Sequence, residues 1–191
     1  SKITSEFATW VDSKIQNIAL KRKKCLILDL DNTLWGGVLG EEGINGIQIG
    51  GDYPGKAFLY FQEALSALSK EGIILSVCSK NNEEDVFEAW EQNPFMVLRK
   101  KDFVAIRINW NDKASNIVEL SKELNIGLDS MVFIDDNPAE RELVKQTLPM
   151  VAVPDFPKQA YMLPQFFMQL VRDYFEAVSY THLTLPTTER V

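Results

Sequence analysis

Two aspartates, two residues apart, follow the first apolar run of the chain. Asp29 and Asp31 come directly after Cys25–Leu28, at the point where a β-strand should end. In an extended chain the side chains of residues i and i+2 point to the same side, so these two carboxylates should lie close together. Two like charges on one side repel each other unless a cation or a shared proton lies between them.

A second acidic pair, Asp135 and Asp136, follows another apolar run, Met131–Ile134. Two strands that each end in carboxylates predict a single magnesium site. Magnesium held by carboxylates usually serves phosphate chemistry.

Further polar residues follow other predicted strands. Ser79, Lys80 and Asn81 come after the run 73–78, and Lys113 opens the helix after 103–108. Each feature alone has an ordinary explanation, because an aspartate at a strand end often caps a helix and a serine often sits in a turn. A lone lysine is usually a solvated surface residue. The joint occurrence of these residues in this order is much more specific.

The elements that must position these residues alternate along the chain. Apolar runs predict strands, and 3.6-residue periodicity with capping residues predicts helices. This alternation predicts an α/β fold, with a parallel sheet of about five strands and helices on both faces. Ligands bind at the carboxyl ends of such strands, where all these polar residues fall. The predicted strands are 25–30, 73–78, 103–108, 131–134 and 150–153, and the predicted helices are 3–20, 54–70, 82–90, 113–124, 161–178 and one that begins at Asn137-Pro138.

The chain divides into a main domain with additions at both ends. We expect an amphipathic helix over residues 1–22, the catalytic domain over 23–156 and a C-terminal helix over 157–178. The Thr-rich residues 179–191 lack helical periodicity and resemble translated adaptor read-through, so we interpret them as a non-native tail. Within the domain, the Gly-rich stretch 35–51 predicts a small flap, and no segment is long enough for a large cap domain.

Composition narrows the classes of function. The net charge of −7 over 191 residues provides no electrostatic footprint for nucleic acid. No apolar stretch approaches the roughly 20 residues that cross a bilayer, so no membrane partner is expected. Two cysteines in apolar runs, Cys25 and Cys78, favour a reducing cytoplasm over a disulfide framework. A single histidine makes a histidine-based zinc site or a Ser-His-Asp triad improbable.

The ordered set resembles the haloacid dehalogenase (HAD) superfamily of aspartate-nucleophile phosphotransferases. Its Asp-x-Asp-x-Thr/Val motif corresponds to Asp29–Thr33, its Ser/Thr motif to Ser79, its Lys/Arg motif to Lys113 and its acidic pair to Asp135-Asp136. Receiver domains of response regulators gather similar residues. In receivers, however, the acidic pair ends the first strand and the Ser/Thr and Lys come last, whereas here a second acidic pair comes last.

A closer resemblance is to the FkbH-like branch of that superfamily and extends over about residues 24–154. Members of this branch often lie within longer proteins of polyketide or surface-glycan biosynthesis. The segments that carry the resemblance are 28–43, 50–55, 77–81, 110–113 and 133–141.

The superfamily resemblance implies a role for each residue. Asp29 is expected to be the nucleophile that forms an aspartyl-phosphate, and Asp31 the general acid and then base. Mg2+ is expected to bind the Asp29 carboxylate, the Asp31 backbone carbonyl and Asp136. Asp135 is expected either to bind the ion directly or to contact one of its ligands. Lys113 would supply fixed positive charge. The predicted phosphate contacts are Ser79, Lys80, Asn81 and the backbone N–H groups of Leu30 and Asn32.

The branch resemblance implies a less common reaction. Some FkbH-like proteins dephosphorylate 1,3-bisphosphoglycerate and load the glyceryl unit onto an acyl carrier protein. A thiol would carry the acyl group, and Cys78 is the candidate because it adjoins Ser79; burial of Cys78 in the core is the alternative. Plain hydrolysis of a phosphorylated small molecule is the other enzymatic option. A docking or phosphate-sensing module that kept the fold is the non-enzymatic alternative.

Overall fold

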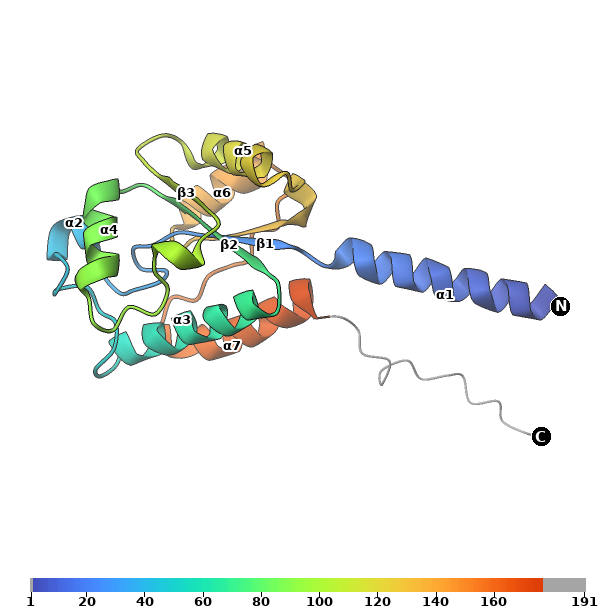
Figure 1. Ribbon diagram of the computed structural model, residues 1–191, viewed down its shortest axis with the longest axis horizontal. Helices are drawn as coiled ribbons and strands as arrows, with labels where there is room; N and C mark the ends of the chain where they lie inside the picture. The colour runs from blue at the N-terminus through green and yellow to red at the C-terminus, as the bar shows by residue number, and fades with distance from the viewer. Residues whose placement is uncertain (1, 177–191) are drawn as a thin grey trace.

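The computed structural model describes residues 2–176, and for 16–21 the backbone alone. A parallel sheet lies between two helical layers, as predicted (Figure 1). Helices α5 and α6 cover one face, and α3 and α7 cover the other. The strands, in the order β3-β2-β1-β4, are β1 (Cys25–Leu28), β2 (Ile74–Ser79), β3 (Ala105–Ile108) and β4 (Met131–Ile134). The helices are α1 (Lys2–Lys21), α2 (Leu39–Glu42), α3 (Gly55–Lys70), α4 (Glu83–Gln92), α5 (Lys113–Leu124), α6 (Pro138–Thr147) and α7 (Leu163–Leu170), with short turns η1 (Lys100–Asp102), η2 (Leu128–Ser130), η3 (Ala160–Met162) and η4 (Val171–Phe175).

The central strand β1 is buried on both faces. Leu26 and Leu28 belong to the core on the side of α3, whereas Cys25 and Ile27 belong to the core on the side of α5. Because both sides of the strand are covered, its sequence is a continuous apolar run rather than an alternating one. Because β1 is packed on both faces, the position of its carboxyl end is fixed, and Asp29 is the next residue in the chain.

The fifth predicted strand, over 150–153, forms only one bridge to the sheet. Ala152 pairs in parallel with Val132, its N–H donating to Met131 (3.1 Å) and its carbonyl accepting from Phe133 (2.8 Å). Pro149 and Pro154 flank the segment, and proline lacks the N–H that would extend a ladder. The sheet therefore has four strands instead of about five.

The predicted C-terminal helix packs onto the domain. Its described part consists of η3, α7 and η4, and α7 lies against α3. Phe61, Phe156 and Phe166 form an aromatic cluster there, with ring centroids 5.2–6.3 Å apart. Residues 177–178 of this predicted helix and the tail 179–191 lie outside the described residues.

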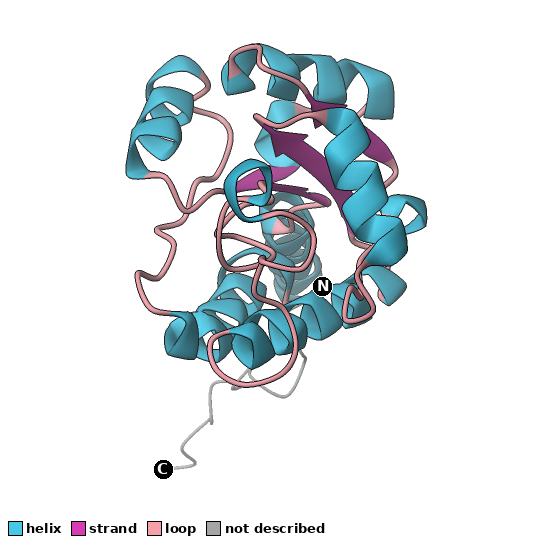
Figure 2. Cartoon of the chain, turned by 90° about the vertical axis from the view of Figure 1, so that its left-hand side faces the viewer, coloured by secondary structure: helices cyan, strands magenta, loops and turns pink. Residues whose placement is uncertain are grey.

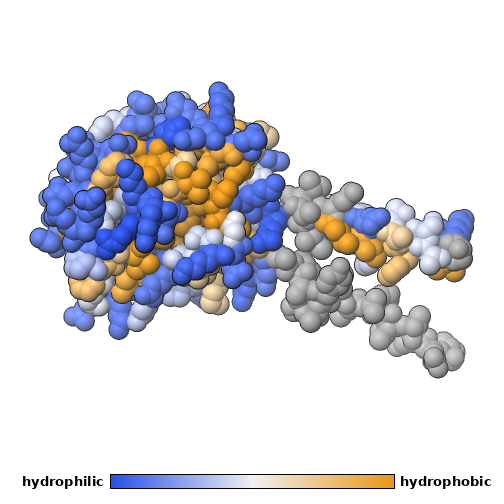
Figure 3. All heavy atoms as spheres, in the orientation of Figure 1, coloured by the Kyte–Doolittle hydropathy of each residue, from blue (hydrophilic) through white to orange (hydrophobic). Residues whose placement is uncertain are grey.

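Helix α1 spans most of the residues predicted to form an N-terminal amphipathic helix, and it projects away from the sheet (Figure 1). Its apolar stripe is exposed (Figure 3), with Ile3, Phe7, Trp10 and Ile15 each about half exposed or more. Among the residues that the structure describes, no helix is both long and apolar enough to cross a membrane.

The loops at the carboxyl ends of the strands gather on one side of the molecule (Figure 2). The predicted small flap lies there. Gly36 and Gln48 pair as a short antiparallel bridge (N···O 2.9 and 2.8 Å), and the four-residue α2 lies between them in the chain. Residues 2–176 contain no separate cap domain, and flap residues Gly36 and Gln48 line a pocket together with Asp136, which follows β4.

Candidate active site

Three carboxylates from two neighbouring strands converge at the carboxyl end of the sheet. Asp29 continues β1, with its N–H donating to Ile134 of β4 (3.0 Å). Asp135 and Asp136 follow β4, and oxygens of all three carboxylates lie within 4.8 Å of one another. The parallel pairing of β1 with β4 therefore brings together acids that are more than a hundred residues apart in the sequence.

Lys113, the first residue of α5, joins two of these acids. Its Nζ lies 2.5 Å from Asp135 Oδ2 and 3.2 Å from Asp29 Oδ1, and the side chain is 5% exposed. Asp112 caps the helix by accepting from the N–H of Ser115 (3.2 Å). This cap fixes the start of α5 and so directs Lys113 towards the acids.

Two further residues hold the loop that carries Asp136, and the sequence analysis predicted no role for either of them. The Thr33 hydroxyl donates to Asp136 Oδ1 (3.3 Å) and accepts from the Asp136 N–H (3.2 Å). Arg141 donates to the carbonyls of Asp135 and Asp136, both at 2.9 Å. A signal for Arg141 was available, because a cation in the first turn of a helix is disfavoured by the helix dipole unless another contact compensates.

Asp31 follows Asp29 by two residues, and its carboxylate accepts hydrogen bonds from three protein donors. Its Oδ1 accepts from Trp35 Nε1 and the Leu39 N–H, both at 2.9 Å. Its Oδ2 accepts from Asn81 Nδ2 at 2.8 Å. The backbone turns at Asp31, so this carboxylate is not among the three that converge, and three donors fix its orientation instead.

The residues predicted to contact phosphate lie in different environments. Ser79 is buried at the end of β2, and Leu30 is buried. Asn32 is exposed at a positive φ of 56° and accepts from the Gly37 N–H (2.8 Å). Lys80 pairs with Glu140 at 2.9 Å, and Asn81 donates to Asp31, as described above, so both side chains already have protein partners.

Both cysteines are fully buried in the core on the α5 side. Burial raises the pKa of the Cys78 thiol to about 12 and that of Cys25 to about 11. The Sγ of Cys78 donates weakly to the Lys113 carbonyl (3.8 Å). In this arrangement Cys78 is a packed thiol, which is the structural alternative that the sequence left open.

The acidic cluster carries more negative charge than one lysine can offset. Burial raises the pKa of Asp29 to about 8; Lys113 opposes this shift, and the charge on Asp135 adds to it. Burial and the charge on Asp135 also raise the pKa of Asp136. For Lys113, burial would lower the pKa, but Asp29 and Asp135 outweigh burial and raise it.

This arrangement fits a magnesium ion. Oxygens of Asp29, Asp135 and Asp136, all within 4.8 Å of one another, would hold a single Mg2+. Oxygen donors are the ligands that Mg2+ prefers, and an added cation would stabilise the ionised carboxylates of Asp29 and Asp136, whose pKa values burial and the charge on Asp135 raise. Asp136 is the most exposed of the three and opens towards solvent.

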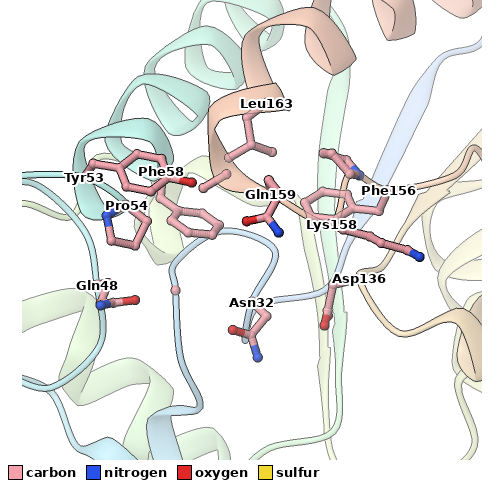
Figure 4. A pocket seen from close by; sticks show the side chains of 13 residues that line it. Asn32, Gln48, Tyr53, Pro54, Phe58, Asp136, Phe156, Lys158, Gln159 and Leu163 are labelled. Carbon is pink, nitrogen blue, oxygen red and sulfur yellow. The ribbon is translucent and has the colours of Figure 1, made fainter.

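A pocket of about 480 Å³ lies directly beside Asp136 (Figure 4). We call it the side pocket. Its walls come from the loop after β1, the flap, the start of α3 and the segment that leads into α7. Its lining residues are Asn32, Gly36, Gln48, Tyr53, Pro54, Phe58, Asp136, Phe156, Pro157, Lys158, Gln159, Ala160 and Leu163.

The family model for NLI interacting factor-like phosphatases matches residues 24–162. The chain belongs to this family. The match covers all four strands and every converging acid, and it places the chain in the HAD superfamily, as the order of the motifs predicted. A comparison with curated proteins found no match.

Solved structures agree with this family assignment. The chain is 48% identical, with a TM-score of 0.78, to the N-terminal part of BF1531 from Bacteroides fragilis, which contains a phosphatase domain and was crystallised with Mg. That match covers 82% of this chain and 42% of the other, so this chain spans less than half of that relative. The HAD domain of the effector Lem4 from Legionella pneumophila has a TM-score of 0.58 at 16% identity, over 83% of this chain and 99% of that one, which supports the fold alone.

Proposed function

We propose that this chain is a magnesium-dependent phosphatase that transfers the phosphoryl group of a small phosphomonoester to Asp29 and then to water. The observation that carries the proposal is the convergence of Asp29, Asp135 and Asp136, with Lys113 paired to the first two. The match to NLI interacting factor-like phosphatases supports the reaction class, and the Mg-bound relative from B. fragilis supports the metal.

In the first half of the reaction, an Asp29 carboxylate oxygen attacks phosphorus and the bond to the leaving oxygen breaks. Asp31, in its protonated form, delivers a proton to that oxygen, so an alcohol departs. In the second half, water attacks the aspartyl-phosphate, and Asp31 takes the proton of that water. Inorganic phosphate leaves, and the Asp29 carboxylate is restored.

The surrounding residues hold these groups in position. Lys113 balances charge on Asp29 during transfer, and the bonds from Trp35, Leu39 and Asn81 keep the Asp31 carboxyl in one orientation. Asp29 and Asp136 would hold the metal, with Asp135 as a further ligand or as the partner that fixes Lys113. Mg2+, when bound, offsets the repulsion between an anionic nucleophile and an anionic phosphate.

Hydrolysis of p-nitrophenyl phosphate tests this proposal. We expect turnover with Mg2+, a loss of about 100-fold or more after EDTA treatment, and recovery when excess Mg2+ is returned. Full activity in EDTA would contradict the metal requirement. No turnover of any small phosphomonoester with Mg2+ would favour the non-enzymatic alternative, a docking or phosphate-sensing module.

The resemblance to the FkbH-like branch carries a narrower hypothesis, the loading of a glyceryl unit from 1,3-bisphosphoglycerate onto an acyl carrier protein. That reaction needs a thiol that can reach the acyl group. Cys78 is the candidate, but its complete burial and raised pKa count against it. Hydrolysis is therefore the better-supported reaction.

Intact-mass spectrometry separates these two reactions. After incubation with 1,3-bisphosphoglycerate and Mg2+, hydrolysis alone predicts an unchanged protein mass apart from any trapped aspartyl-phosphate. A glyceryl adduct that is present in the wild type and in Cys25→Ala but absent from Cys78→Ala would instead support acyl loading.

A further inference from the structure

The side pocket combines an apolar wall with carboxamide groups. Phe58, Phe156 and Leu163 form the wall and are nearly fully buried, which fixes its shape. Carboxamides come from three separate segments: Asn32 from the loop after β1, Gln48 from the flap and Gln159 from the segment before α7. The volume of about 480 Å³ falls within the usual range for sites that bind small molecules.

The carboxamides of this pocket are available to a ligand. Among the described residues, the side chains of Gln48 and Gln159 have no hydrogen-bond partner, and the Asn32 side-chain nitrogen has none either. In Figure 4, Gln48 lies at the left of the pocket and Gln159 lies near its middle, between Phe58 and Phe156. A carboxamide both donates and accepts hydrogen bonds, as a hydroxyl group does, so the two groups pair in either direction.

The charges around the pocket disfavour an anionic organic group. Asp136 borders it, next to the converging acids. Lys158 is the cation among the lining residues, but its side chain points away from Gln48 and Gln159 (Figure 4). A second anionic group on the substrate would therefore lie beside the substrate's own phosphate, with the neutral amides of the pocket as its partners.

We infer that the side pocket binds the organic part of the substrate and that Gln48 and Gln159 select phosphomonoesters of neutral, polyhydroxylated alcohols. This inference rests on the proposed function, because it takes the phosphate to lie at Asp29 and Asp136. The alcohol then extends from the leaving oxygen into the pocket. Its hydroxyls bond to the carboxamides, and its C–H groups pack on Phe58 and Phe156.

Three esters with the same number of carbon atoms test the selection. Glucitol 6-phosphate carries hydroxyls, 6-phosphogluconate adds a carboxylate, and n-hexyl phosphate has neither. We expect kcat/KM for glucitol 6-phosphate to exceed the value for each of the other two by about tenfold or more. Gln48→Leu and Gln159→Leu should each reduce the ratio of kcat/KM for glucitol 6-phosphate to kcat/KM for n-hexyl phosphate by about tenfold.

A matched control is available on α7. Gln165→Leu makes the same substitution outside the pocket lining and should leave that ratio unchanged. Equal kcat/KM values for the three esters, or unchanged ratios in both pocket variants, would overturn the inference while leaving the phosphatase in place. A preference for 6-phosphogluconate that disappears in Lys158→Met would overturn it in favour of an anion site. Failure to hydrolyse all three esters and p-nitrophenyl phosphate would overturn the proposed function and this selection with it.

Discussion

Asp29→Asn is expected to reduce phosphomonoester turnover by about 10⁴-fold or more, because asparagine keeps the shape of the side chain but cannot form the aspartyl-phosphate. The measurement is kcat for p-nitrophenyl phosphate at saturating Mg2+. Asp155→Asn is the matched control, since Asp155 is largely exposed and, within the part of the chain that the structure describes, forms an ion pair only with Lys145 at 3.7 Å. A rate for Asp29→Asn near that of the wild type would show that another residue is the nucleophile.

The same variant separates lost chemistry from lost folding. In metal-free protein the pKa of Asp29 is raised from 3.8 to about 8, so the folded state binds more protons than the unfolded state between these values. The free energy of unfolding of the wild type should therefore fall as the pH rises through this range. Asp29→Asn lacks this titration, so in EDTA it should be more stable than the wild type at pH 8, with a smaller difference at pH 5. Thermal unfolding at the two pH values checks this expectation, and a less stable variant at pH 8 would contradict it.

Lys113→Met is expected to affect both stability and catalysis. It leaves Asp29 and Asp135 buried without their cation, which in metal-free protein should cost about 3–5 kcal/mol of unfolding free energy. For a domain of this size the corresponding decrease in Tm is about 10 °C. Turnover should fall by about 100-fold or more, because the fixed charge beside the nucleophile is lost.

The control for this variant is Lys145→Met, which removes an exposed ion pair with Asp155 and should change the unfolding free energy by less than about 1 kcal/mol. Added Mg2+ should restore part of the lost stability in Lys113→Met, since the ion supplies positive charge to the same carboxylates. An unchanged Tm together with unchanged turnover would contradict the role of Lys113.

The convergence of acids was predictable from the sequence because it follows from strand ends. Two apolar runs that each end in aspartates must form neighbouring parallel strands for the acids to meet, and β1 and β4 do so. The irregular backbone of the flap was likewise predictable from its glycines. Several of them adopt positive φ, which other residues rarely do.

Other features depended on contacts that a local pattern does not contain. The predicted fifth strand is apolar enough to pair, but it forms only the bridge at Ala152 between two flanking prolines. The carboxylate of Asp31 accepts from Trp35 and Leu39 of the flap and from Asn81 after β2, and the sequence pattern around Asp31 contains none of these contacts.

The sequence by itself determined the α/β fold and the edge of the sheet at which the acids lie, because apolar runs that end in aspartates are local patterns, and burial of a strand on both faces requires such runs. The tertiary structure alone decided that Lys113 joins two of these acids, that Cys78 is packed away, and that the segment before α7 forms one wall of the side pocket. That wall depends on the packing of Phe61, Phe156 and Phe166, which brings α7 against α3. Such contacts join residues about a hundred positions apart, and no periodicity in the sequence records them.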